Sequence, residues 1–469
     1  MSAPPMRLLL LSYWFPPTNA VGAVRTGKFA KYLHEAGHEV RVVAGPRAAP
    51  LTLPLEIPET LVSRPAADPT PSPARASPAA PVSGRLGAGR SRAAEVLRRH
   101  WHAARHVPDK QAVWMAQAVE LGRALLRGWQ PDLIVASAPP YSGLIAAARL
   151  SAESAVPWVA ELRDPWSGNA YNDRPAWRDW LDRIMERRTL RSASALVAVS
   201  PVVARELKAS YRQLVMTIFN GYAPEDVPPS HAPGPHQALS IVYTGTIYEG
   251  RRDPSPLFAA IARLPEAARR RVRVSFHGPS ECQVHALAAR HDVLEQVAVM
   301  PSVTYQESLA IQAKADILLL LQRNHPEDEG NLPAKVFEYL GALRPILLLG
   351  YPKGELAKLI RERGAGLVSN EPATIATQLV DWLARLSAGG IPALPETARA
   401  GLSRAAQFVH FEAFLRDHAL TRPITPPAPL PGEGLTDLAV PASGGREPDG
   451  GVPAQPPRRV LDELSSHPP

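Results

Sequence analysis

Residues 6–44 read MRLLLLSYWFPPTNAVGAVRTGKFAKYLHEAGHEVRVVA, and this stretch decides the fold class. Met6 to Ser12 is a mostly apolar run, and a loop of Pro, Thr, Asn and Gly follows it. Phe29 and Leu33 then recur at helical spacing, and Val40 to Ala44 is a second apolar run. The pattern predicts a strand, a helix and a strand, which implies a parallel sheet with a right-handed crossover.

The same alternation continues along the chain in two blocks. Its strands are short apolar runs without polar alternation, which is typical of parallel strands buried on both faces. The predicted strands are residues 133–137, 158–162 and 195–199 in the first block, and 241–243, 272–276, 317–321, 346–349 and 366–368 in the second. Helices are predicted over residues 112–128, 280–290 and 334–343. We therefore expect two doubly wound α/β domains, which place the carboxyl ends of both sheets at a shared cleft.

Proline-rich stretches divide the chain. Residues 46–100 contain Pro, Ala, Ser and Arg in low-complexity order, which predicts a largely disordered insert. Residues 222–238 are rich in Pro and turn formers, which is typical of an interdomain linker. We expect an N-terminal Rossmann-like domain over residues 1–221, the linker over 222–238, a C-terminal Rossmann-like domain over 239–395, a helical segment over 396–421 that returns to the N-terminal domain, and a disordered tail over 422–469.

Composition narrows the classes of function. The 469 residues carry a net charge of +8 and one cysteine, Cys282, so neither an intrachain disulfide nor a cysteine-based zinc site can form. We expect a cytoplasmic protein. Because residues 8–15 are too short to cross a bilayer, we read them as a buried strand and not as a signal peptide. No nucleic-acid-binding signature is visible, whereas the positive charge suits a phosphorylated substrate or peripheral contact with an anionic inner membrane face.

Two loops of the N-terminal block carry candidate binding residues. Residues 16–25 run directly into a helix, where Gly22 would let the backbone approach a ligand and free helix amides would suit a phosphate. Taken alone, a single glycine is better explained by an ordinary turn between a strand and a helix than by a phosphate-binding loop. Residues 161–166 place Asp164 after a buried strand, where it could bind a sugar hydroxyl or pair with Arg163 to cap the turn.

A glycine-containing loop in the C-terminal block also follows a strand. Gly245 and Thr246 could wrap a phosphate that Arg251 or Arg252 neutralises, and a basic surface loop is the alternative.

A helix that opens at Pro333 carries the remaining candidates. It projects Lys335 and Glu338 from one face, the first toward a diphosphate and the second toward ribose hydroxyls. A surface salt bridge between the two is the bland alternative.

Five elements in this order resemble the family 4 glycosyltransferases of the GT-B fold, especially the branch of colanic-acid and other exopolysaccharide transferases. They are residues 13–25, 137–142, 163–166, 243–246 and 335–340. The resemblance covers residues 6–45 and 106–390. It implies a retaining, metal-independent transfer from a nucleotide-diphosphate sugar, without a cofactor, to a glycan, lipid-linked or other hydroxyl acceptor in polysaccharide biosynthesis.

The resemblance also assigns roles to residues. The donor side would contain Gly22, Gly245, Thr246, Arg251, Lys335 and Glu338, and the acceptor side Arg25, Ser137, Arg163 and Asp164. Asp164, Arg251 and Lys335 would lie closest to the chemistry, with no metal site. Stabilisation of the leaving diphosphate would be the main task of the protein.

The sequence departs from the family pattern at two places. Glu338 matches the second glutamate of the Glu-x7-Glu pattern, but the first falls at Gly330, one residue after Glu329. The histidine of many relatives is also unmatched, because the loop there contains Ser137. A nucleotide-sugar epimerase of the same fold and a catalytically inactive partner protein stay open as alternatives. We expect the acidic residues 327–329 to form a solvated loop and not a metal site.

Overall fold

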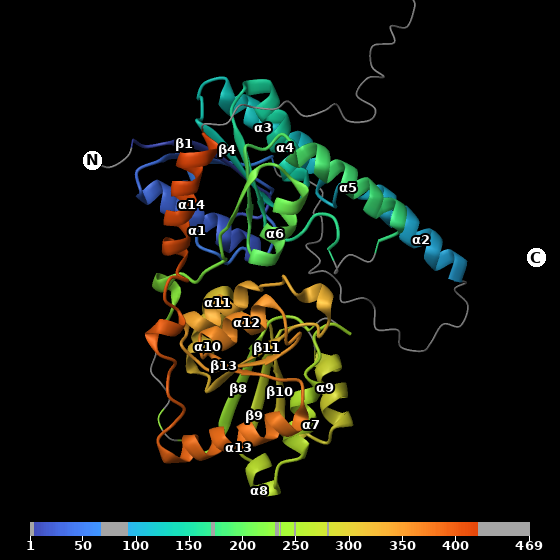
Figure 1. Ribbon diagram of the computed structural model, residues 1–469, viewed down its shortest axis with the longest axis vertical. Coiled ribbons are helices and arrows are strands. Elements are labelled where there is room, and N and C mark those ends of the chain that lie inside the picture. Colours follow the sequence, from blue (N-terminus) through green and yellow to red (C-terminus); the bar gives the residue numbers. More distant parts are fainter. Residues whose placement is uncertain are drawn as a thin grey trace, which may run out of the picture. The chain divides into compact units, whose positions relative to one another are not determined.

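The computed structural model describes residues 4–66, 92–169, 174–229, 234, 236–247, 250–278 and 281–420 (Figure 1). The chain builds two parallel sheets. The first has the strand order β3-β2-β1-β4-β5-β6-β7 and the second the order β10-β9-β8-β11-β12-β13. In each sheet the strand order reverses next to the first strand, as in doubly wound folds.

The first sheet contains β1 (Arg7–Ser12), β2 (Glu39–Ala44), β3 (Val62–Ser63), β4 (Leu133–Ala138), β5 (Trp158–Leu162), β6 (Ala195–Ala198) and β7 (Leu214–Thr217). Its helices are α1 (Val21–Glu35), α2 (Arg92–Arg105), α3 (Ala112–Leu126), α4 (Ser142–Ser154), α5 (Ala176–Leu190) and α6 (Pro201–Ser210).

Both faces of this sheet are buried. Along β1, Leu8 and Leu10 pack into one hydrophobic cluster with α1, whereas Leu9 and Leu11 pack into another with α3 and α4. Successive side chains of a strand point to opposite faces, so an unbroken apolar run is what a sheet covered on both faces requires.

The second sheet contains β8 (Leu239–Thr244), β9 (Val272–His277), β10 (Val297–Met300), β11 (Ile317–Leu321), β12 (Ile346–Leu349) and β13 (Gly366–Val368). Its helices are α7 (Ser255–Ala262), α8 (Glu266–Arg269), α9 (Glu281–Arg290), α10 (Tyr305–Lys314), α11 (Ala334–Gly341), α12 (Glu355–Glu362) and α13 (Pro372–Ala388). Helices α7, α9 and α13 cover one face, and α11 and α12 cover the other. The predicted α/β class and the predicted strands of both sheets are confirmed, with shifts of one or two residues at some ends.

Part of the expected insert is ordered, so the expectation of disorder is wrong for residues 46–66 and 92–100. Val62 pairs with Val42 in the first sheet, and Arg64 donates a hydrogen bond of 2.8 Å to the carbonyl of Gly45. Residues 92–100 form most of α2. Residues 67–91 and the predicted tail after 420 lie outside the described residues.

The last described helix, α14 (Arg404–Phe414), packs against α1, which is more than 350 residues earlier in the chain (Figure 1). Phe29 of α1 stacks on Phe411 with a centroid distance of 4.6 Å, and Tyr32 donates a hydrogen bond of 2.9 Å to Glu412. No helix among the described residues is both long and apolar enough to cross a membrane.

Candidate functional site

The strand orders indicate where a ligand should bind. In a doubly wound sheet, ligands bind beyond the carboxyl ends of the strands, where the strand order reverses. That place lies between β1 and β4 in the first sheet and between β8 and β11 in the second. The loops that follow these strands are those that contain residues 16–25, 137–142, 243–253 and 326–335, so the candidate residues gather there.

A cavity of about 920 Å³ opens at these loops and has walls from both sheets. This volume suits a ligand larger than a single sugar. Predicted residues that line it are Gly22, Arg163, Asp164, Gly245, Thr246, Lys335 and Glu338. Predicted residues that do not line it are Arg25, Ser137 and Arg251.

Gly22 lies against the guanidinium group of Arg163. A Cβ added at Gly22 would come within 1.8 Å of Nη1 of Arg163, so any side chain at position 22 would displace the arginine. Nε of Arg163 donates a hydrogen bond of 3.2 Å to the carbonyl of Ala138, and Nη2 donates to the carbonyl of Pro139. Arg163 therefore holds the end of β4 while it presents a cation to the cavity.

Asp164 follows Arg163 in the cavity wall, with its side chain exposed to the cavity. The surrounding protein removes water from this carboxyl and raises its pKa, whereas the charge of Arg163 lowers it. Asp164 is thus placed to accept a hydrogen bond from a hydroxyl in the cavity.

Arg25 and Ser137 lie beneath the cavity and pair with the same buried carboxylate, so their expected contact with an acceptor is wrong. Arg25 donates to Glu161 from Nε at 3.0 Å and from Nη2 at 2.8 Å. Ser137 donates to the other oxygen of Glu161 at 2.5 Å. The three side chains are at most 5% exposed. Arg25 also donates to the carbonyl of Phe219 at 2.7 Å, so it ties α1 to β5 and to the chain that leaves the first sheet.

On the other wall, Gly245 makes room for Lys335. Gly245 has a φ of +132°, and a Cβ built there would lie 2.2 Å from Nζ of Lys335. Nζ lies 4.9 Å from the ring centroid of Tyr243, within the range of a cation–π interaction. Lys335 is in the first turn of α11, where unpaired backbone amides add positive potential. The ammonium group and these amides point to an anion site.

Arg252, and not Arg251, is the arginine of the 243–253 loop that lines the cavity. Nη1 of Arg252 donates a hydrogen bond of 2.9 Å to the carbonyl of Thr246, and the hydroxyl of Tyr243 donates to the same carbonyl at 3.0 Å. Of the two arginines predicted for the phosphate, Arg252 is therefore the one in the cavity wall.

Glu338 lies one turn along α11 and forms no ion pair with Lys335 among the described residues. Instead it accepts a hydrogen bond of 3.4 Å from Nε2 of Gln312. Arg404 and Tyr305 lie near it, and Arg404 donates to the tyrosine hydroxyl at 3.3 Å. Burial and the nearby Glu338 raise the pKa of Tyr305 to about 12, while Arg404 lowers it, so the phenol stays protonated. Because Glu338 bonds to Gln312 and forms no ion pair with Lys335, the alternative of a surface salt bridge between these two residues is excluded.

At position 330 a side chain would be crowded. A Cβ added at Gly330 would lie 3.0 Å from Cβ of Val202 on α6. The neighbouring Glu329 accepts an ion pair of 3.4 Å from Arg205 of the same helix, with both side chains at least half exposed. The loop therefore approaches α6 closely enough to explain the absence of a glutamate at 330.

The expectation of a solvated acidic loop holds for Glu327 and Glu329 but is wrong for Asp328, which is fully buried. The turn of residues 326–328 folds this aspartate inward, and its carbonyl accepts a hydrogen bond of 3.2 Å from Gln322.

A second group of acids, Glu56, Glu225 and Asp226, has the spacing of a metal site. Nζ of Lys28 lies within 3.1 Å of all three carboxylates, and Nζ of Lys31 donates to Glu56 at 2.8 Å. Two ammonium groups already pair with these three carboxylates, and the cluster joins α1 to the segment that connects the two sheets.

Several cavity residues were missed by the sequence reasoning. Trp14 and Glu206 line the N-terminal wall, and His277 and Arg404 line the C-terminal wall. Burial lowers the pKa of His277, so its imidazole is neutral at pH 7. His277 could have been predicted from sequence, because it is the last residue of a buried strand and such strand ends face the cavity. No sequence pattern indicated Arg404, because it lies on α14, far along the chain from the loops that it contacts.

Comparisons with known proteins bear on both the fold and the family. Residues 22–218, from α1 to β7, match the family described as Glycosyl transferase 4-like domain. No curated protein is a match in sequence. Sucrose-phosphate synthase from Thermosynechococcus elongatus is similar in structure, with a TM-score of 0.59, 13% identity, and coverage of 88% of this chain and 98% of that one.

Two further solved structures are similar. Anabaena HepE in complex with UDP has a TM-score of 0.56, 14% identity, and coverage of 88% of this chain and 100% of that chain. A glycosyltransferase from Rickettsia africae has a TM-score of 0.54, 14% identity, and coverage of 88% and 98%. At such identities the likeness establishes the fold, which is the predicted two-domain GT-B fold.

Proposed function

We propose that this chain, in which a glycosyl transferase 4-like domain forms one half of a GT-B fold, transfers a sugar from a nucleotide-diphosphate donor to a hydroxyl acceptor. The family match and the fold support the assignment as a glycosyltransferase. The observation that carries the donor class is the placement of Lys335 and Glu338, without an ion pair between them, on the first two turns of α11, both lining one cavity. A diphosphate and a ribose are the neighbouring anionic and hydroxyl groups that such a pair fits.

On the donor side, Lys335 and the first amides of α11 would neutralise the diphosphate as its charge grows during departure. Arg252 takes the part expected of Arg251, at the edge of the Gly245–Thr246 loop. Glu338 would accept bonds from the ribose hydroxyls, held by Gln312. One fixed cation aimed at a developing charge is a preorganised catalytic element.

On the acceptor side, Arg163 and Asp164 face the donor wall across the cavity. We propose that Asp164 orients the attacking hydroxyl and that Arg163 supplies positive potential beside it. In this proposal the transfer retains anomeric configuration and uses no metal, with a glycan or lipid-linked acceptor of polysaccharide synthesis. Position 330 is a glycine, so we propose that the neighbouring Glu329, which lines the cavity, takes the part of the first glutamate.

The epimerase alternative is less well supported. An epimerase handles one substrate and needs no second wall for an acceptor, whereas this cavity has Trp14, Arg163 and Asp164 opposite the donor loops. Release of free nucleoside diphosphate only when an acceptor is present would separate the two activities.

We expect one nucleoside diphosphate among UDP, GDP, ADP and TDP to stabilise the purified chain. At a concentration 100 times its Kd, a ligand that binds the folded state adds about 2.7 kcal/mol to the free energy of unfolding. Thermal shift measures the effect, and the matching nucleoside monophosphate is the control, because it lacks one of the phosphates that Lys335 would meet. If the monophosphate stabilises equally well, or if no nucleotide does, the proposed donor class is wrong.

A further inference from the structure

Arg404 is a buried cation without a paired carboxylate. Among the described residues, four arginines are at most 4% exposed, namely Arg25, Arg178, Arg344 and Arg404. The first three each form an ion pair with a carboxylate, at 2.8, 2.9 and 4.0 Å. Within the described ranges Arg404 forms none. Because a buried charge without a partner destabilises a fold, this exception needs an explanation.

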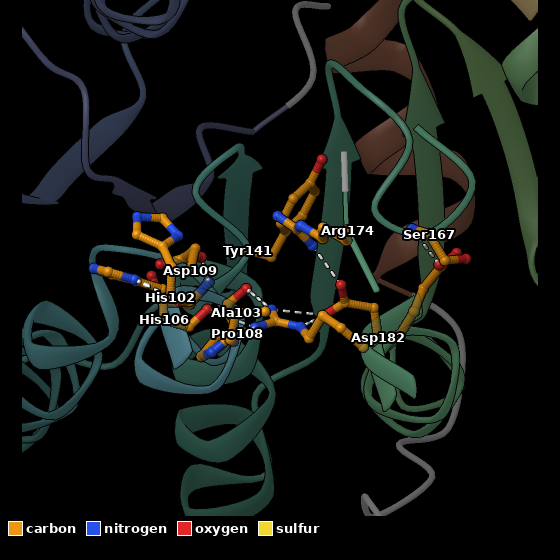
Figure 2. Close-up of polar contacts among 12 residues, drawn as sticks. His102, Ala103, His106, Pro108, Asp109, Tyr141, Ser167, Arg174 and Asp182 are labelled. Atoms are coloured by element: carbon orange, nitrogen blue, oxygen red, sulfur yellow. Dashed lines mark hydrogen bonds and ion pairs between the residues drawn. The ribbon is translucent and has the colours of Figure 1, made fainter. Parts of the chain in front are cut away.

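Arg178 shows how a buried arginine is satisfied elsewhere in this chain. Its guanidinium group donates to one carboxylate and three carbonyls, which belong to Asp182, Ala103, His106 and Pro108 (Figure 2). These contacts use all the N–H groups that an arginine side chain has. No donor of Arg178 is left for a ligand.

Arg404 uses fewer of its donors. Nε donates a hydrogen bond of 3.2 Å to the carbonyl of Asn220, and Nη1 donates one of 3.3 Å to the hydroxyl of Tyr305. Nη2 has no partner among the described residues, and it keeps contact with the cavity that Arg404 lines. This amino group is therefore available to a ligand in the cavity.

The start of α14 holds Arg404 in a fixed position. The backbone N–H of Arg404 donates to the carbonyl of Tyr222 at 2.7 Å, and the N–H of Tyr222 donates to the carbonyl of Leu402 at 3.1 Å. Gly221 has a φ of +65°, and a Cβ built there would lie 3.0 Å from the backbone nitrogen of Arg404, so the two segments pass close together. A ligand that meets Nη2 thus meets a donor that is positioned before binding.

Glu338 is the charged neighbour of Arg404 in the cavity wall. Gln312 donates to one oxygen of Glu338 at 3.4 Å, and the other oxygen has no partner within the described part of the chain. Burial lowers the pKa of Arg404, but Tyr305 and Glu338 raise it, and the net shift is upward. The carboxylate is therefore near enough to act on the guanidinium group, although the two form no direct ion pair.

The chemistry of these two groups selects a class of ligand. Nη2 of Arg404 can only donate hydrogen bonds, and the ionised carboxylate of Glu338 can only accept them. A hydroxyl does both, because it has one proton to donate and two lone pairs to accept. A phosphate has no such fit, since Glu338 would repel it.

We propose that Arg404 is a further donor-binding residue, which donates from Nη2 to the ribose hydroxyl whose proton Glu338 accepts. The inference rests on the proposed function, from which it takes the ribose at Glu338. It brings α14, which packs against the first half of the chain, into contact with a ligand held by the second half. A site built to bond a hydroxyl discriminates against analogues that lack it, so Arg404 makes the site selective for an intact ribose.

The test is equilibrium titration of the full chain with UDP, GDP, ADP and TDP and with the 2′,3′-dideoxy counterpart of each. We expect Arg404→Met to weaken binding of the best diphosphate at least about tenfold, which is the scale of one hydrogen bond to a charged group. Binding of its dideoxy counterpart should stay unchanged, because no hydroxyl is left for Arg404 to contact. Arg404→Lys keeps the charge and an N–H donor, so it should recover part of the loss.

Arg399→Met is the matched control. Arg399 lies over the ring of Tyr222 at the same junction and donates to the carbonyl of Gly341 at 2.7 Å, but it does not line the cavity. This variant should bind both forms of the nucleotide as the unmodified chain does.

Two results would overturn the role of Arg404 alone. One is an equal loss for the diphosphate and its dideoxy form in Arg404→Met, which is what a purely structural role gives. The other is additive losses in Glu338→Gln/Arg404→Met, because two residues that bind one hydroxyl do not contribute independently. An unmodified chain that binds none of the four diphosphates would instead refute the proposed donor class, and this inference with it.

Discussion

Lys335→Ala is expected to lower kcat about 100- to 1,000-fold at saturating donor. That is the usual effect of removing one preorganised group that stabilises a developing negative charge. Lys335 has this position because Gly245 leaves room for its ammonium group, which lies over the ring of Tyr243 at the start of α11. Its attraction to the diphosphate grows as the bond to the sugar breaks, so the transition state loses more than the ground state does.

The control for this variant is Lys353→Ala, which removes an exposed lysine from the same half of the chain. Its kcat should equal that of the unmodified enzyme. Steady-state kinetics with varied donor, together with a thermal melt, distinguish a lost catalytic charge from lost folding. An unchanged kcat in Lys335→Ala would remove the main support for a donor phosphate at α11.

Glu338→Gln should differ in kind from Lys335→Ala. Ribose hydroxyls are bound equally before and during transfer, so a carboxylate that holds them contributes to donor affinity and little to kcat. Loss of one charge-assisted hydrogen bond is about 1.5 to 3 kcal/mol, or roughly ten- to a hundredfold in donor affinity. The donor Kd measured by titration should rise while kcat at saturation changes little. A fall in kcat with an unchanged Kd would contradict this role.

Much of the cavity wall around α11 was predictable from sequence, and the reason is local. Lys335 and Glu338 lie three residues apart on one helix whose start is marked by Pro333, so spacing alone places them on one face. The strands were equally readable, because each is an apolar run buried on both faces. Strands β3, β7 and β10 were missed, and all three lie at sheet edges. In β7 and β10 the apolar pattern is broken, because Leu214 and Met300 are exposed.

What the sequence could not predict depends on contacts between distant residues. Arg25 and Glu161 are 136 positions apart, and nothing in either motif says that they pair. The choice between Arg251 and Arg252 depends on the path of one loop. The crowding at Gly330 comes from Val202, which approaches from another helix. Helix α2 was hidden because its Ala- and Arg-rich sequence resembles the low-complexity segment before it.

Breaking the buried ion pair of Arg25 and Glu161 is expected to lower the free energy of unfolding strongly. Arg25 and Ser137 both donate to the buried carboxylate of Glu161. In Arg25→Met only the bond from Ser137 is left of these two. Removing one member of a buried pair typically costs about 3 to 5 kcal/mol, because a charge is left without compensation. Arg7→Met is the matched control, since Arg7 pairs with Asp132 at the surface and should cost at most about 1 kcal/mol.

The pair also predicts how stability depends on pH. Burial raises the pKa of Glu161, but the charge and hydrogen bonds of Arg25 and the bond from Ser137 outweigh it, so the pKa is lowered overall. A carboxylate with a lowered pKa stabilises the fold above its unfolded pKa of about 4.3, and this contribution is lost as the pH falls through the folded value. Urea unfolding of Glu161→Gln should therefore show a weaker loss of stability on acidification than the unmodified chain shows.

The double variant Arg25→Met/Glu161→Gln should lose less than the sum of the two single losses, because it leaves no buried charge unpaired. Additive losses would mean that the two side chains stabilise the first half independently and that the pair does not hold the floor of the cavity.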